Sequence, residues 1–112
     1  MPYQQPRLDG VFPALADPTR RAGLARLSAG PTSTSDLAKP FKMALPSFTE
    51  HLDVLEDSGL VRSRKDGRVR TYELTPQPLR AAESWMARQR ALWEKRFDQR
   101  DSYLALVREE KP

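Results

Sequence analysis

The 112-residue chain contains no cysteine and a single histidine, His51. The missing thiols exclude disulfides, thiolate metal ligands and thiol redox switches. One imidazole without a thiol partner, in a sequence that also lacks a glycine-rich phosphate loop, does not assemble a nucleophile and its base. We therefore expect that the chain is not an enzyme and that it uses no metal or other cofactor.

Long apolar runs are also missing. A membrane-spanning helix requires about 20 predominantly apolar residues, and the N-terminus has no signal-peptide pattern, so we expect a cytoplasmic protein with no membrane partner. The length suits one domain. We expect residues 1–7, with Pro2 and Pro6, to form a flexible arm before a single domain over residues 8–108.

Residues 43–58 carry the clearest helical pattern in the chain. Phe48, Leu52 and Leu55 recur at i, i+4 and i+7, which predicts one buried face on a helix from about Ala44 to Ser58. Gly59 then follows, a residue suited to the left-handed turn that ends helices.

A basic hairpin is predicted directly after this helix. Asp66-Gly67 lies between two extended runs, and this pair favours a type I′ turn, which needs positive φ at both central residues. From Val61 to Tyr72 there are five basic residues and one acid, a local charge of +4. This equals the net charge of the whole chain, so the rest of the chain is neutral in sum. A helix followed at once by a basic hairpin is typical of a winged helix-turn-helix.

Further helices complete this interpretation. Asp17-Pro18 is a helix start, with a carboxylate cap and proline at the first helical position, and Thr34 or Ser35 can cap a short helix after a polar loop over residues 31–35. The fold expected is mainly α with a small β-hairpin, a winged helix-turn-helix of about five helices and a two-stranded wing. The other expected helices cover residues 8–16, 18–29, 36–39 and 76–107.

Several ordered motifs resemble the ArsR-type (arsenic-repressor) winged-helix regulators. The run FPALADPTRR at residues 12–21 is similar to the entry signature of that family, and the segments at residues 36–43, 51–56, 59–61 and 67–74 fit it in order and spacing. The resemblance covers roughly residues 8–104. It implies a homodimer that binds double-stranded operator DNA and usually represses transcription.

The sequence departs from the family pattern in two places. Metal-sensing members carry cysteines on the short helix before the recognition helix, or Asp and His on the last helix, and neither set is present here. We therefore expect a metal-independent branch. Ala44 stands where the family commonly has a serine cap, a loss of about 1 kcal/mol that Pro46 in the first turn would offset.

Only the first two turns of a recognition helix normally reach base edges. Glu50 could accept a hydrogen bond from cytosine N4, but it could instead belong to a solvated acidic face with Asp53, Glu56 and Asp57. His51 could likewise pack between helices as a neutral imidazole. The predicted base contacts are Pro46, Ser47, Thr49, Glu50 and His51.

Phosphate neutralisation provides most of the affinity in such complexes, so the basic hairpin is expected to hold the DNA backbone, and Arg68 or Arg70 could enter the minor groove. The alternative is that these charges only protect an exposed sheet edge. Lys39, Lys42 and Arg20 are weaker candidates for phosphate contact than the hairpin. The predicted phosphate or minor-groove contacts are Lys39, Lys42, Arg62, Arg64, Lys65, Arg68 and Arg70.

The broad apolar stripe of the last helix predicts pairing with a second copy, which would place half-sites about 34 Å apart on a pseudo-palindromic operator. Trp85 and Trp93 could also line an effector site, although large aromatics at helical spacing are more often core or interface. A second hypothesis for function is a winged-helix protein-interaction or assembly module without specific DNA binding. The predicted dimer interface contains Leu8, Val11, Phe12, Trp85, Leu92, Trp93, Phe97 and Leu104.

Overall fold

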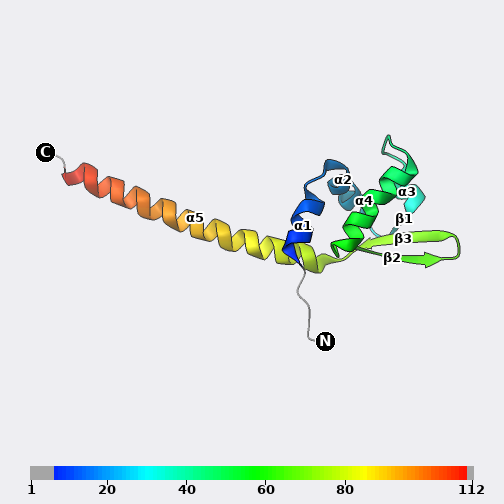
Figure 1. Ribbon diagram of the computed structural model, residues 1–112. Helices are drawn as coiled ribbons and strands as arrows, with labels where there is room; N and C mark the ends of the chain where they lie inside the picture. Colours follow the sequence, from blue (N-terminus) through cyan, green and yellow to red (C-terminus); the bar gives the residue numbers. More distant parts are fainter. Residues whose placement is uncertain (1–6, 111–112) are drawn as a thin grey trace, which may run out of the picture. The chain divides into compact units, whose positions relative to one another are not determined.

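The computed structural model describes residues 7–110 of the chain (Figure 1). These residues form two compact units, the first ending at Ala82 and the second starting at Glu83. Apart from Arg7, the predicted flexible arm lies outside the described residues, and the single domain over residues 8–108 stays a prediction. In chain order the elements are α1 (Leu8–Leu15), α2 (Pro18–Leu27), β1 (Thr32–Ser33), α3 (Thr34–Ala38), α4 (Leu45–Asp57), β2 (Val61–Asp66), β3 (Val69–Leu74) and α5 (Pro76–Glu110).

The starts of α2 and α3 are set by side-chain caps. Asp17 Oδ2 accepts a hydrogen bond from the backbone N–H of Arg20 at 3.0 Å, as the Asp17-Pro18 pair predicted. At α3 the predicted cap was wrong, because Ser33 rather than Thr34 or Ser35 accepts the N–H of Asp36, at 3.3 Å. Ser33 has the extended backbone that a capping residue needs, whereas Thr34 is already helical.

Helix α4 begins without a side-chain cap at Ala44, as expected, and ends in a Schellman turn. The N–H of Leu60 donates to the carbonyl of Leu55 at 3.0 Å, and the N–H of Gly59 donates to the carbonyl of Glu56 at 3.0 Å. Gly59 has φ +82°, a left-handed conformation that glycine adopts without strain because it has no Cβ. Leu55 and Leu60 both lie in the core, so the turn fixes where the wing leaves the helix.

The wing, formed by β2 and β3, belongs to a three-stranded antiparallel sheet in the order β1-β3-β2. The prediction of only two strands was therefore incomplete, since residues 31–35 were expected to be a loop. The predicted turn type was also wrong. Asp66 pairs with Val69, so Gly67 and Arg68 are the central residues, and only Gly67 has positive φ. Glycine at the first central position is the pattern of a type II′ turn.

The core of the first unit is built where α1 to α4, the sheet and the first turns of α5 meet. Val11 lies in this core with no exposed surface. Tyr72 is buried there too, and this burial raises the pKa of its hydroxyl. The buried members are Val11, Ala14, Leu24, Leu27, Leu37, Phe48, Leu52, Leu55, Leu60, Val61, Tyr72 and Ala82.

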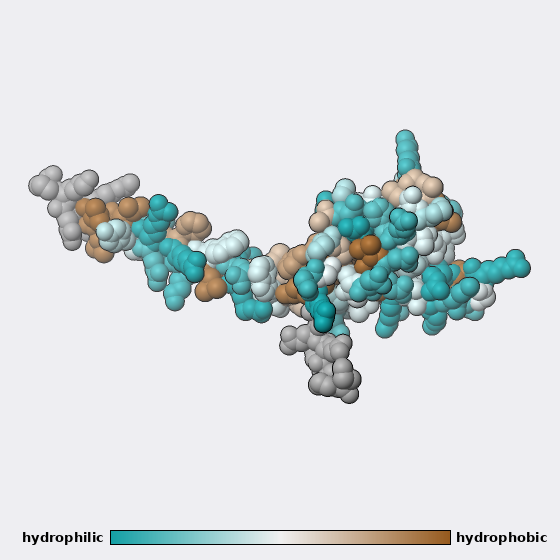
Figure 2. All heavy atoms as spheres, viewed as in Figure 1, coloured by the Kyte–Doolittle hydropathy of each residue, from teal (hydrophilic) through white to brown (hydrophobic). Residues whose placement is uncertain are grey.

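The second unit consists of α5 from Glu83 onward. Large apolar side chains are exposed along it, among them Leu92, Trp93 and Phe97, and brown surface recurs along this helix in Figure 2. Over residues 7–110, no helix has both the length and the apolar content that crossing a membrane demands.

Candidate nucleic-acid interface

Helix α4 buries one face and exposes the other, as the apolar spacing predicted. Phe48, Leu52 and Leu55 are buried. Phe48 is also stacked on Phe41 from the turn before α4, with ring centroids 4.8 Å apart, so the turn and the helix are packed together. The first two turns of α4 are therefore held on the surface of the first unit.

The residues predicted to contact bases differ in their freedom to do so. Pro46, Ser47 and Glu50 are exposed, whereas Thr49 and His51 are half-buried. The Thr49 hydroxyl already donates to the carbonyl of Leu45 at 2.9 Å, so only its lone pairs remain for a base. Ser47 and Glu50 are thus the polar side chains best presented for hydrogen bonding.

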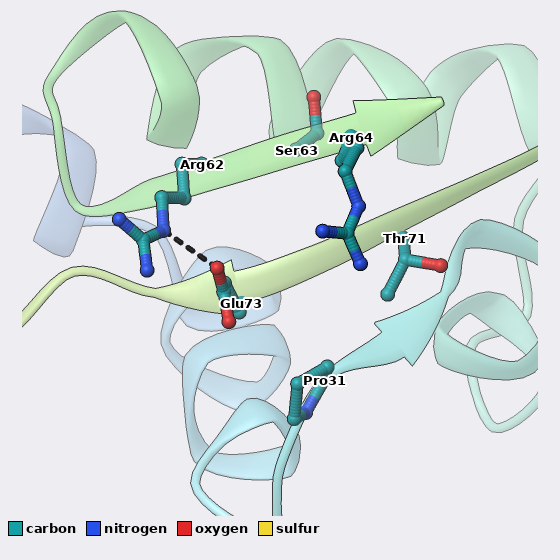
Figure 3. Close-up of a pocket in the computed structure, with 6 residues that line it drawn as sticks. All are labelled: Pro31, Arg62, Ser63, Arg64, Thr71 and Glu73. Carbon is teal, nitrogen blue, oxygen red and sulfur yellow. Dashed lines mark hydrogen bonds and ion pairs between the residues drawn. The ribbon is translucent and has the colours of Figure 1, made fainter. Parts of the chain in front are cut away.

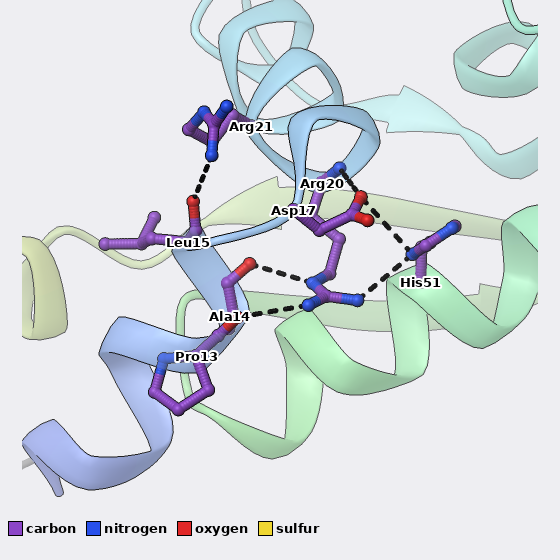
Figure 4. A network of polar contacts seen from close by, with 7 residues as sticks. All are labelled: Pro13, Ala14, Leu15, Asp17, Arg20, Arg21 and His51. Carbon is purple, nitrogen blue, oxygen red and sulfur yellow. Dashed lines mark hydrogen bonds and ion pairs between the residues drawn. The ribbon is translucent and has the colours of Figure 1, made fainter.

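His51 lies in a polar network that joins α4 to α1 and α2 (Figure 4). Its Nδ1 lies 3.2 Å from Nη1 of Arg20 and 3.7 Å from Oδ2 of Asp17. Because a guanidinium can only donate, Nδ1 is the acceptor and the ring proton belongs on Nε2. One ring nitrogen is thus engaged inside the protein, the arrangement expected if His51 packs between helices.

The guanidinium of Arg20 also closes the end of α1. Its Nε donates to the carbonyl of Ala14 at 2.8 Å and its Nη2 to the carbonyl of Pro13 at 3.0 Å (Figure 4). Arg20 was considered a weak phosphate contact, but these bonds satisfy carbonyls that a helix leaves without partners at its last turn. We therefore assign it a structural role.

The carboxylate of Glu56 ties the other end of α4 to the wing. It accepts hydrogen bonds from the backbone N–H of Ser63 at 3.0 Å and from the Ser63 hydroxyl at 2.6 Å. The same hydroxyl accepts a bond from Nη1 of Arg70 at 2.8 Å. Glu56 is therefore not part of a solvated acidic face, and the network orients Arg70 beside the recognition helix. No local sequence pattern signalled this contact.

The strand register divides the basic residues of the wing between its two faces. Lys65 pairs with Arg70 on the face that Ser63 and Tyr72 share, toward α4. Arg62 and Arg64 point to the opposite face, and Arg68 occupies the turn. Figure 2 shows hydrophilic side chains projecting from the free end of the wing.

A groove of about 430 Å³ lies on the face of the wing that carries Arg62 and Arg64 (Figure 3). Within it, Nε of Arg62 bonds Oε1 of Glu73 at 2.6 Å, so the charge of Arg62 is already compensated. Pro31, before β1, forms a wall of the groove. Of the five basic wing residues, Arg62 is therefore the least available for a phosphate.

The two lysines before α4 are both exposed. Nζ of Lys39 lies 2.9 Å from Oδ1 of Asp36, and the hydrogen bond from Lys39 lowers the pKa of that carboxyl. For Lys42 the structure shows no ion pair with a described residue. Lys42 is thus the better phosphate candidate of the two.

Two apolar residues at this end were overlooked by sequence reasoning. Met43 is 36% exposed, and Leu45 is 51% exposed. The signal that could have found Leu45 is its place in the first helical turn, before the buried stripe starts.

Comparison with known proteins finds relatives that are transcriptional regulators by name. Residues 15–64 match the helix-turn-helix domain family. The chain is 40% identical over 79 residues to an HTH-type transcriptional regulator of Mycobacterium tuberculosis, covering 70% of this chain and 72% of that protein. It is 32% identical over 79 residues to the transcriptional repressor SdpR of Bacillus subtilis, covering 70% and 88%. The crystal structure of an ArsR family transcriptional regulator matches with 60% identity and a TM-score of 0.75, covering 78% of this chain and 90% of that one.

The chain belongs to the ArsR family. It is therefore a transcriptional regulator whose winged helix-turn-helix is a DNA-binding domain. Within this ArsR-family protein, α3 and α4 form the helix-turn-helix, and β2 with β3 form the wing.

Proposed function

We propose that this protein is a homodimeric repressor in which α4 reads the bases of a pseudo-palindromic operator while the wing holds the phosphate backbone. The observation that carries this proposal is the pairing of an exposed start of α4 with a basic wing that is tied to the same helix through Glu56 and Ser63. A tie of this kind lets both elements meet one duplex at a fixed spacing.

The two elements supply different parts of the binding free energy. Helix α4 and its flanking residues 44–58 contain four acids and no lysine or arginine, whereas the wing carries a local charge of +4. Cation contacts to phosphates release counterions and give affinity without sequence information. We therefore assign affinity to the wing and base preference to Ser47 and Glu50, with Glu50 accepting a bond from cytosine N4.

The second copy is proposed from the exposed apolar surface of α5. Trp93 and Phe97 are 57% and 61% exposed, and Leu92 is also exposed. Aromatic residues of this size bring large buried area to an interface. Leu8 and Phe12 of α1 remain part of the proposed interface, but Val11 does not, because it is fully buried in the core of its own subunit.

DNA release by a metal ion is not part of the proposal. The chain has no cysteine, and its one histidine already accepts a bond from Arg20. Among residues 7–110 no group of three or more acidic, cysteine or histidine side chains is placed to hold a metal ion. Addition of Zn²⁺ or of a chelator should leave DNA binding unchanged.

Selection from a random duplex library, followed by sedimentation of the free protein, tests the proposal. We expect an inverted repeat whose half-site centres lie about 34 Å apart, and a dimer at micromolar concentration. Trp93→Glu should give a monomer with weakened operator binding. Ala91→Glu is the matched control, because it adds the same single negative charge at an exposed position about 160° from Trp93 around the helix. A monomeric wild-type protein, or one that selects no sequence, would refute the proposal.

A further inference from the structure

Four consecutive apolar residues, Met43 to Pro46, are exposed at the start of the recognition helix. The core does not account for them. Phe48 and the rest of the buried stripe lie deeper along α4, and neither Met43 nor Leu45 belongs to the core or to the partly buried residues packed against it. Consecutive exposed apolar residues are unfavourable on a folded surface unless they serve a function.

The position of this segment, here called the apolar tip, indicates what it contacts. It consists of the two residues before α4 and the first two residues of the helix, and in a helix-turn-helix the N-terminal residues of that helix meet base edges in the major groove. Lys42 is exposed immediately before it, and a lysine there can contact a phosphate. The apolar tip is therefore continuous with the proposed DNA-binding surface.

The major groove offers one apolar group on its base edges, the C5-methyl of thymine. Side chains cannot donate a hydrogen bond to a base at this end of the helix, because Met43, Ala44, Leu45 and Pro46 have no side-chain donor. We propose that Met43 and Leu45, together with Pro46, contact thymine methyl groups, so that the operator requires thymine opposite the apolar tip. This inference rests on the proposed function, to which it adds the chemical group that is recognised.

A protein partner fits the apolar tip less well. A specific protein interface buries roughly 800 Å² on each partner, and four residues offer only a small part of that area. The acidic Glu50 and the basic Lys42 that flank the apolar tip are also suited to a base edge and a phosphate.

The experiment uses the best duplex from the random-library selection, synthesised with deoxyuridine in place of one thymine at a time in one half-site. Deoxyuridine pairs as thymine does and lacks only the methyl group. Burying one methyl-sized group is worth about 0.8 kcal/mol, or about fourfold in Kd. At one or two positions we expect wild-type affinity to fall about fourfold.

Leu45→Ala and Met43→Ala are then measured on the same duplexes, with melting followed by circular dichroism to confirm folding. The loss of affinity caused by replacing thymine with deoxyuridine should disappear in the variant that lacks the contacting side chain. Val54→Ala is the matched control, because Val54 is 39% exposed on the same helix but lies in its third turn. This control should keep the full fourfold loss.

Two results would overturn the inference while leaving the proposed function intact. One is a selected operator whose affinity is unchanged by deoxyuridine at every position. The other is a loss that is the same in the wild type, Leu45→Ala and Met43→Ala. Failure to select any sequence would instead overturn the proposed function, and the inference with it.

Discussion

Replacing Arg68 by alanine should flatten the dependence of DNA binding on salt. Arg68 is exposed in the turn of the wing, next to Gly67, and forms no ion pair with a described residue, whereas Arg62 pairs with Glu73. Each phosphate neutralised on B-DNA contributes about −0.9 to the slope of log K against log salt. A homodimer presents two wings, so the slope should become less negative by about 1.8.

The consequence is measurable over an ordinary salt range. Between 50 and 200 mM salt, a slope difference of about 1.8 means that the Kd of the wild type should rise by a factor about twelve times larger than the Kd of Arg68→Ala. Fluorescence anisotropy titrations of wild type and Arg68→Ala against operator and random duplexes would give both slopes. Since a phosphate contact carries no sequence information, the variant should weaken binding to both duplexes alike.

Arg62→Ala is the matched control on the same hairpin. The guanidinium of Arg62 lies 2.6 Å from Glu73 through its Nε, so its charge is balanced within the protein and fewer counterions are released through it. Relative to the wild type, the slope of log K against log salt should change less in Arg62→Ala than in Arg68→Ala. Equal slopes for Arg68→Ala and the wild type would refute the assignment of backbone contacts to the wing turn.

Three further predictions concern base preference, the tie between helix and wing, and acid stability. Glu50→Gln should change which bases are preferred in a library selection, and an unchanged motif would remove its base-reading role. Ser63→Ala leaves the half-buried Glu56 carboxylate without one charge-assisted hydrogen bond and should lower the free energy of unfolding by about 1–2 kcal/mol, measured by urea titration; unchanged stability would contradict the tie. The backbone N–H of Arg20 is the main cause that lowers the pKa of Asp17 below its ordinary 3.8. The contribution of Asp17 to the free energy of unfolding should therefore be present above about pH 4 and be lost as the pH falls through the lowered pKa. In this window the melting temperature of Asp17→Asn should depend less on pH than that of the wild type.

Local patterns were sufficient for most of the helices. The spacing of Phe48, Leu52 and Leu55 gave the buried face of α4, and Gly59 gave its end. These features depend on neighbours within one or two turns, where side-chain period and backbone preference act directly. Strand β1 was missed because its two residues are too few to show a period, and its pairing partner, β3, lies far along the chain.

The polar contacts of the site could not be predicted in the same way. Arg20 and His51 are separated by 31 positions, and their contact depends on how α1, α2 and α4 pack. Glu56 was grouped with solvated acids because its face of the helix was judged without the wing. In both cases a charged residue that looked free in the sequence had a partner supplied by the tertiary structure.

The recognition helix is held by apolar burial and by two directional contacts, and these act differently. Burial of its stripe turns the apolar face of α4 toward the core, but because the hydrophobic effect is non-directional it defines small rotations about the helix axis less sharply. His51 and Glu56 lie about 140° apart around the helix at 3.6 residues per turn, and they bond Arg20 and Ser63 respectively. Hydrogen bonds on two flanks resist rotation because turning α4 either way lengthens one of them. The direction in which Glu50 faces is therefore set by residues that need not contact a base.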